Sequence, residues 1–216
     1  MIIKKLGASI IAVALTFSLS GCMGSTTTKL PEGDVKIVNQ EVQGVVDLLL
    51  QSANYGDGKS IVNSMILPEG SQYQLNLILE NYNDGNLIKE TEIANYETDN
   101  IEKDSIINII INSAKLNDDK EDTSIYSFAE IDRENTTDSK NPNYKISKYY
   151  GEAISYDKIN TISQIGKSLE EEIPLVAFIK YKDGDSELKD INLDTYKDEV
   201  SNYSEVSVVK LKVSKK

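Results

Sequence analysis

Tyr73–Glu80 has the sequence YQLNLILE and is the stretch that decides the fold class. Its odd-numbered residues are all apolar and most of its even-numbered residues are polar, which is the period of a half-buried β-strand. The tetrapeptide NDGN at Asn83–Asn86 follows closely, and Asp-Gly is a strong signal for a tight hairpin turn because both residues accept a positive φ. Leu87–Tyr96 is the expected return strand. The stretch therefore predicts an antiparallel hairpin.

Other segments rich in β-branched and aromatic residues predict further strands after this hairpin. They are Ser105–Leu116, Ser124–Asp132, Ile173–Lys182, Asp185–Leu193 and Val206–Val213. The isoleucines of the first of these form a nearly continuous run, so that strand is expected to be buried on both faces. The predicted fold class is mainly β: an antiparallel β-sandwich, formed either as one large sandwich or as two tandem immunoglobulin-like modules.

One N-terminal helix is also expected, over Val35–Ala53. Apolar residues recur at spacings of four, three and four from Val38 to Leu49, which places one apolar stripe along a helix. Asp34 is in a suitable position for its N-cap. The stripe is interpreted as a face that packs on the core. A strand is the alternative, because the segment mixes valines with Leu48–Leu50.

The two halves of the predicted β region resemble each other after a shift of 99 positions, which aligns Tyr82–Gly85 with Tyr181–Gly184. Such an internal period suggests a duplicated module of about 100 residues. The domain prediction that follows is a first β-rich module at 35–134, including the helix, and a second at 135–216. Chance is the alternative explanation, because Asp-Gly turns recur in many β proteins.

The N-terminus has the pattern of an export signal. Lys4 and Lys5 form a cationic start, and the apolar run Leu6–Leu19 follows. The run is shorter than the ~20 apolar residues that a membrane-spanning helix needs. A cationic start, a short apolar core and small residues before a cleavage site are typical of a secretory signal peptide.

The end of this signal, Leu19-Ser20-Gly21-Cys22, resembles the lipobox of bacterial membrane lipoproteins. The resemblance covers the first 22 residues. It implies that residues 1–21 are removed, that the Cys22 thiol carries a diacylglyceryl group, and that residues 22–34 are a flexible tether. Two or more acyl chains anchor a protein stably. The implied location is therefore the cell membrane, lipid-anchored and facing outside the cytoplasm.

Composition argues against several classes of function. The net charge of -12 disfavours nucleic-acid partners, because an acidic surface repels phosphates. The chain contains no histidine, which excludes a Ser-His-Asp triad and histidine-ligated metal sites. Cys22 is the only cysteine, so no intrachain disulfide forms, and its lipidation leaves no free thiol. No catalytic residue, cofactor or metal site is predicted.

The predicted function is therefore a non-enzymatic binding or interaction module at the cell envelope, with an envelope protein or cell-wall component as its partner. Tyr149 and Tyr150 are the predicted interaction surface, because tyrosine supplies amphipathic contact area at interfaces. A carboxylate-dependent envelope hydrolase is one alternative, since the chain has 35 acidic residues. A solute-binding lipoprotein is the other.

Overall fold

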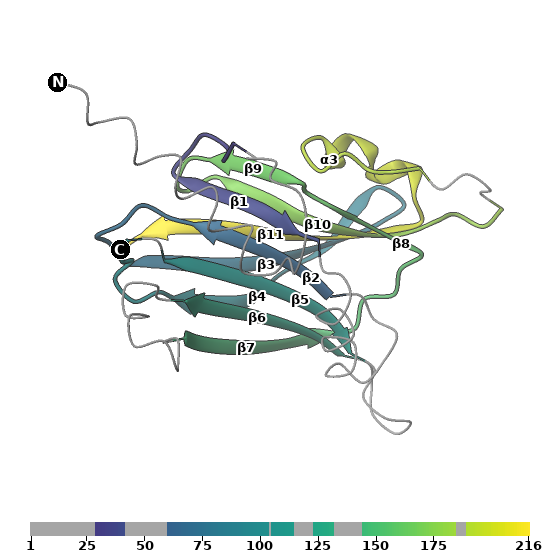
Figure 1. Ribbon diagram of the computed structural model, residues 1–216. Coiled ribbons are helices and arrows are strands. Elements are labelled where there is room, and N and C mark those ends of the chain that lie inside the picture. The colour runs from purple at the N-terminus through teal and green to yellow at the C-terminus, as the bar shows by residue number, and fades with distance from the viewer. Residues whose placement is uncertain (1–28, 42–59, 104, 115–122, 132–143, 185–188) are drawn as a thin grey trace.

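The computed structural model describes residues 29–41, 60–103, 105–114, 123–131, 144–184 and 189–216. They form two antiparallel β-sheets packed face to face (Figure 1). The six-stranded sheet has the order β7-β6-β5-β2-β1-β9, and the five-stranded sheet has the order β4-β3-β11-β10-β8. The strands of the first sheet are β1 (Val35–Gln40), β2 (Ser60–Ile66), β5 (Ile106–Ala114), β6 (Thr123–Ile131), β7 (Tyr144–Glu152) and β9 (Gln164–Lys167). Those of the second are β3 (Tyr73–Asn83), β4 (Asn86–Glu97), β8 (Lys158–Thr161), β10 (Glu172–Lys180) and β11 (Glu205–Lys215).

The hydrophobic core lies between the two sheets and follows the predicted alternation. The odd-numbered residues of β3 from Tyr73 to Leu79 are buried, and β11 places Val209, Leu211 and Val213 beside them. The predicted hairpin turn is confirmed: Asp84 and Gly85 both have positive φ, 45° and 83°. The mainly β fold class and the sandwich architecture are therefore confirmed.

The predicted helix at Val35–Ala53 is wrong where the structure describes it, because Val35–Gln40 is strand β1. Val35 and Ile37 are fully buried while Lys36 is half-buried, so the burial has the period of a strand. β1 hydrogen-bonds to β2 on one side and to β9 on the other. This pairing satisfies the backbone and suits the β-branched side chains. Residues 42–53 lie outside the described part of the chain.

Each sheet contains strands from both of the ranges predicted as modules. In the six-stranded sheet β9 pairs with β1, and in the five-stranded sheet β11 pairs with β3 along eleven residues. The described strands thus build one sandwich, which is the first of the two architectures that the sequence left open. The predicted boundary at residue 134 lies outside the described residues.

The predicted return strand Asp185–Leu193 is not a strand over residues 189–193. The chain instead continues into α3 (Tyr196–Glu199) and the short 3-10 helix η2 (Val200–Asn202). Apolar side chains of this segment are buried against the outer face of the five-stranded sheet; they are Ile191, Leu193, Tyr196 and Val200. α3 is the only α-helix in the described residues, and it lies near the C-terminus. No helix in the described ranges has the length and apolar character needed to cross a membrane.

Side-chain contacts join the edge strands β4 and β7 of the two sheets. The Tyr149 hydroxyl donates a hydrogen bond to the Asn95 carbonyl at 2.7 Å, and Lys89 pairs with Glu152 at 3.3 Å. On the opposite side of the sandwich, the short link between β8 and β9 crosses from one sheet to the other. These contacts cover sheet edges whose backbone groups are open to pairing with other chains.

Candidate functional site

A buried lysine lies at the centre of the charged cluster on the five-stranded sheet. Lys210 belongs to β11 and is 2% exposed. Its Nζ lies 2.5 Å from Glu80 Oε1, 2.7 Å from Glu172 Oε2 and 3.6 Å from Glu90 Oε2. A charge removed from water costs several kcal/mol unless it is paired and hydrogen-bonded. The three carboxylates therefore explain how β11 tolerates a lysine between valine and leucine.

Glu80 connects this lysine to α3. Its Oε2 accepts hydrogen bonds from the Tyr82 hydroxyl at 2.8 Å and from the Tyr196 hydroxyl at 2.5 Å. The Lys197 Nζ lies 3.8 Å from Glu80 Oε1. The rings of Tyr82 and Tyr196 meet edge to face with centroids 6.1 Å apart. Glu80 thus holds α3 against the sheet through a side chain 116 residues away in sequence.

Four groups of this cluster have shifted pKa values: Glu80, Lys210, Tyr82 and Tyr196. Burial alone would raise the pKa of Glu80, but hydrogen bonds from Lys210, Tyr196 and Tyr82 lower it to about 2. Burial would likewise lower the pKa of Lys210, yet Glu172 and Glu80 raise it above its ordinary value of 10.5. Burial and the Glu80 carboxylate both raise the pKa of Tyr82 and of Tyr196. At neutral pH the carboxylate and the ammonium group stay charged, and the two phenols stay protonated.

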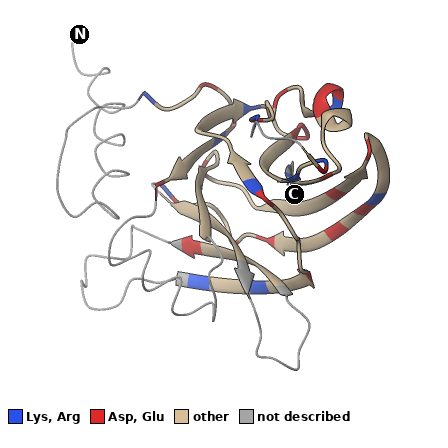
Figure 2. Ribbon diagram, turned by 90° about the vertical axis from the view of Figure 1, so that its right-hand side faces the viewer, with Lys and Arg blue, Asp and Glu red and all other residues tan. Residues whose placement is uncertain are grey.

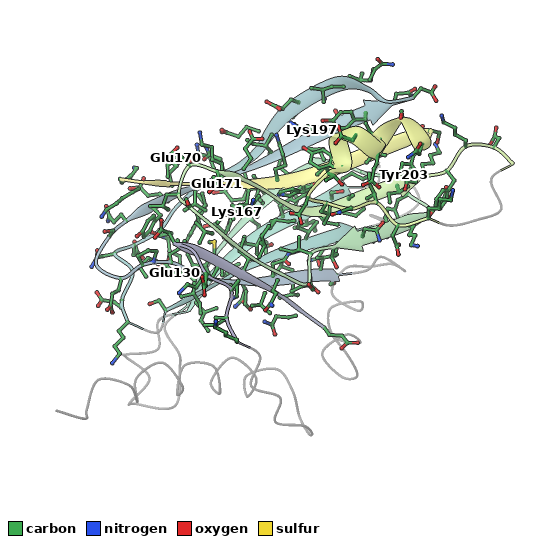
Figure 3. All side chains as sticks on the ribbon, turned by 90° about the horizontal axis from the view of Figure 1, so that it is seen from above. Glu130, Lys167, Glu170, Glu171, Lys197 and Tyr203 are labelled. Atoms are coloured by element: carbon green, nitrogen blue, oxygen red, sulfur yellow. The ribbon has the colours of Figure 1, made fainter. Side chains whose placement is uncertain are left out.

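A pocket of about 270 Å³ opens beside this cluster, between β9, the start of β10 and α3. Its lining residues are Lys167, Glu172, Pro174, Leu193, Asp194, Thr195, Tyr196, Lys197, Asp198 and Lys210. Figure 3 views this face from above, with Lys167, Glu171 and Lys197 labelled. The pocket is thus formed by residues from three parts of the chain, of which Glu172 and Pro174 on β10 and Lys210 on β11 are brought together by the β10–β11 pairing.

The groups at the pocket rim are less tightly paired than those beneath it. Lys167 lies 3.7 Å from Glu171, and Lys197 lies 3.8 Å from Glu80, both at the long end of the ion-pair range. Asp194 and Asp198 line the pocket and form no ion pair with any residue that the structure describes. The rim therefore presents ammonium groups and carboxylates that are accessible to a ligand.

Comparison with protein-family models, with curated proteins and with solved structures found no match. The function of the pocket is therefore inferred from the residues that line it. In the described part of the chain, no group of three or more acidic, histidine or cysteine side chains is arranged to hold a metal ion. The pocket offers charged side chains and no preformed metal centre among those residues.

No motif in the sequence predicts a binding site at the residues of this pocket. The available signal was a lysine flanked by apolar residues in the last strand, at Val209-Lys210-Leu211. A charged residue in a buried stretch predicts a buried partner. The sequence does not indicate that the partner is Glu80, 130 residues earlier.

The residues that the sequence did single out fall elsewhere. Leu19, Ser20, Gly21 and Cys22 lie outside the described residues, and their lipobox role stays a prediction. Tyr149 and Tyr150 point to opposite faces of β7, as neighbours in a strand must. Their role as an interaction surface also stays a prediction.

The two tyrosines have different surroundings. Tyr149 packs edge to face on Phe128 with ring centroids 6.1 Å apart, and its hydroxyl donates the hydrogen bond to Asn95. Tyr150 is 66% exposed, and Ile146, on the same face of β7, is 52% exposed. The exposed part of the predicted surface is therefore Tyr150, while Tyr149 joins β7 to β4.

These surroundings predict different costs for removing each hydroxyl. We expect Tyr149→Phe to lower the free energy of unfolding by about 1 kcal/mol, because it removes the hydrogen bond to the Asn95 carbonyl. Tyr150→Phe is the matched control and should change it by less than about 0.5 kcal/mol, as is usual for an exposed site. Urea denaturation of the two variants measures both values. Equal effects would contradict the assignment of Tyr149 to the junction between the sheets.

The lowered pKa of Glu80 predicts a dependence of stability on pH. Its pKa is about 2 in the folded protein and 4.5 ordinarily, so on acidification the unfolded state binds the proton first. The stabilisation by this carboxylate is therefore full above about pH 4.5 and is lost progressively towards pH 2. We expect wild type to be more stable than Glu80→Gln at pH 6, with the difference shrinking as the pH falls from 4.5 to 3. Denaturation midpoints measured at these pH values test this, and a constant difference would contradict it.

Proposed function

We propose that the protein is a membrane-anchored, extracytoplasmic lipoprotein that acts as a non-enzymatic binding module at the cell envelope. The anchor is proposed from the lipobox-like Leu19-Ser20-Gly21-Cys22, with the lipid on Cys22. The binding site is the pocket beside α3. The rim of this pocket faces solvent, while the cluster beneath it is held by Glu80 and Lys210.

The observation that carries the non-enzymatic proposal is the ion pairing beneath the pocket, where Lys210 Nζ lies 2.5 Å from Glu80 Oε1 and 2.7 Å from Glu172 Oε2. General acid–base catalysis favours a group whose pKa lies near the working pH. Here the Glu80 pKa is lowered to about 2 and the Lys210 pKa is raised, so neither group exchanges a proton readily near neutrality. A protonated lysine is also no nucleophile. A paired cluster of this kind suits a rigid support beneath a binding pocket.

The alternative of a carboxylate-dependent hydrolase has less support. Such an enzyme needs one carboxyl group that stays protonated as the general acid and a second that acts as base or nucleophile. Glu80, whose side chain is 2% exposed, and Glu172, which lines the pocket, both contact Lys210. The Lys210 ammonium group helps to keep Glu80 ionised, so Glu80 is not a protonated general acid. The arrangement therefore favours binding over hydrolysis.

The anchor and the binding role are tested together in intact cells. Wild type, Cys22→Ala and the tether control Ser25→Ala are expressed with a tag, labelled with radioactive palmitate and crosslinked. We expect label and a defined envelope component with wild type and with Ser25→Ala, and the loss of both with Cys22→Ala. Label on Cys22→Ala would contradict the lipid site. Failure of wild type to retain any envelope protein or wall fragment would contradict the binding role.

A further inference from the structure

The size of the pocket beside α3 limits its ligand. Pockets that enclose drug-sized molecules measure roughly 300–1,000 Å³. At about 270 Å³ this pocket is just below that range. Its lining combines charged side chains with the apolar groups of Pro174, Leu193 and the Tyr196 ring. A small polar molecule therefore fits better than a large apolar one.

The charges at the rim limit the chemistry of that ligand. Lys167 and Lys197 approach from β9 and α3, and their present ion pairs are long, 3.7 Å and 3.8 Å. Asp194 and Asp198 have no ion-pair partner among the described residues. Figure 2 shows acidic and basic residues side by side on α3. A ligand that is only an anion or only a cation would pair with either the two lysines or the two carboxylates and leave the other two groups without a partner. A small molecule that carries one positive and one negative charge pairs with both the lysines and the carboxylates.

The cluster beneath the rim keeps this arrangement in place. Lys210 is already paired with Glu80 and Glu172, so it supplies a fixed floor and no vacant site. Glu80 also binds the Tyr196 hydroxyl, and Tyr196 directly precedes Lys197 and Asp198. The charged rim of α3 is thus fixed to the sheet before a ligand arrives. Preorganisation of this kind reduces the entropic cost of binding.

We propose that this pocket binds a small zwitterion, either a free amino acid or a dipeptide, whose ammonium group contacts Asp194 and Asp198 and whose carboxylate contacts Lys167 and Lys197. The inference rests on the proposed binding function and specifies the ligand class of the same pocket. Charge-assisted hydrogen bonds at both ends give the site its selectivity. An amine without a carboxylate, or a carboxylate without an amine, makes only half of these contacts.

Calorimetric titration of the full chain in detergent micelles tests the ligand class. The probes are the common free amino acids and a panel of unmodified dipeptides. We expect at least one probe to bind with a Kd of about 1 mM or tighter. Its N-acetyl derivative and its C-terminal amide should each bind at least tenfold more weakly, because each loses one charge. Absence of binding by every probe, or equal binding by the blocked derivatives, would overturn the proposal.

Substitutions at the pocket rim, compared with matched substitutions elsewhere, test whether the ligand binds in this pocket. Lys197→Gln and Asp198→Asn should each weaken binding of the best probe at least tenfold. Lys148→Gln and Asp183→Asn remove the same charges from exposed positions away from the pocket and should leave the affinity unchanged. Equal effects of the two pairs would overturn the assignment to the pocket.

The same samples also show whether a failure concerns the ligand class or the proposed non-enzymatic function. Proton NMR of the best dipeptide after a day with the protein should show intact peptide. Cleavage would contradict the non-enzymatic function while leaving the ligand class standing. If no zwitterion binds but the cell experiment captures an envelope component, the ligand class is wrong and the binding module stands.

Discussion

Replacing Lys210 with methionine is expected to lower the free energy of unfolding by about 3–5 kcal/mol. The substitution keeps the approximate length of the side chain and removes its charge. Glu80, whose side chain is 2% exposed, then loses its closest cation. It keeps the hydrogen bonds from Tyr82 and Tyr196 and the longer ion pair with Lys197. A buried carboxylate without a close counter-ion accounts for most of the expected cost. Urea denaturation at neutral pH measures it.

Lys212→Met is the matched control for this prediction. Lys212 lies two residues further along β11, its side chain is 38% exposed, and its contact to Glu170 is 3.3 Å. Exposed ion pairs of this kind contribute at most about 1 kcal/mol. The double variant Glu80→Gln with Lys210→Met should recover part of the loss, because neither charge remains buried alone. Equal costs for Lys210→Met and Lys212→Met would show that the cluster contributes little.

Gly166→Ala is expected to lower the free energy of unfolding by about 3 kcal/mol, near the upper end of the usual cost of overpacking. A Cβ at Gly166 would lie far closer to the Glu32 carbonyl oxygen than a van der Waals contact allows, so the backbone must shift. A Cβ at Gly33 would likewise lie 2.7 Å from the Lys167 backbone nitrogen. The shift would weaken the pairing of β1 with β9 and displace Lys167 from the pocket rim. Chemical denaturation measures the first effect.

Gly70→Ala separates this clash from the general cost of replacing a glycine. Gly70 has a φ of 79°, and a Cβ there would have no atom within 4 Å. Its expected cost is therefore only the left-handed backbone conformation, about 1–2 kcal/mol. If Gly166→Ala costs no more than Gly70→Ala, the close approach of the two backbones does not constrain the fold.

The sequence predicts the β-sandwich because its signals are local. The alternation of Tyr73–Leu79 and the Asp84–Gly85 turn each specify their own structure without distant contacts. The error at β1 has the opposite cause. Val35–Gln40 has apolar residues that fit both a helical and a strand period, and its pairing with β9, more than 120 residues away, decides between them.

The two segments aligned by the 99-residue shift form different structures, because their strands pair with different partners. Tyr82–Gly85 ends β3 and begins a true hairpin with β4. Tyr181–Gly184 follows β10, but β10 pairs directly with β11, and residues 189–193 do not form a return strand. Ile191 and Leu193 are instead buried against the sheet. The duplication of the two halves stays a prediction. The different strand pairings that follow the two aligned turns do not support it.

The pocket was not predictable because its residues are brought together by pairings across the whole chain. Glu80, Glu172 and Lys210 come from three different strands, and Tyr196 from the helix that covers them. Each residue alone has the appearance of an ordinary charged or aromatic position. The lipobox, by contrast, is a contiguous motif, and its role is predicted from the sequence without any contact in the fold.

The most direct test of the fixed-charge binding site is the titration of the Lys210 side chain by NMR. Lysines labelled with ¹³C at Cε are followed as the pH rises, and Lys210→Met identifies the Lys210 resonance. The account predicts that Lys210 remains an ammonium ion up to and beyond its ordinary pKa of 10.5, because Glu80 and Glu172 stabilise the charge. A midpoint near neutrality, roughly pH 7–8 as in catalytic lysines, would contradict the account and indicate an enzyme.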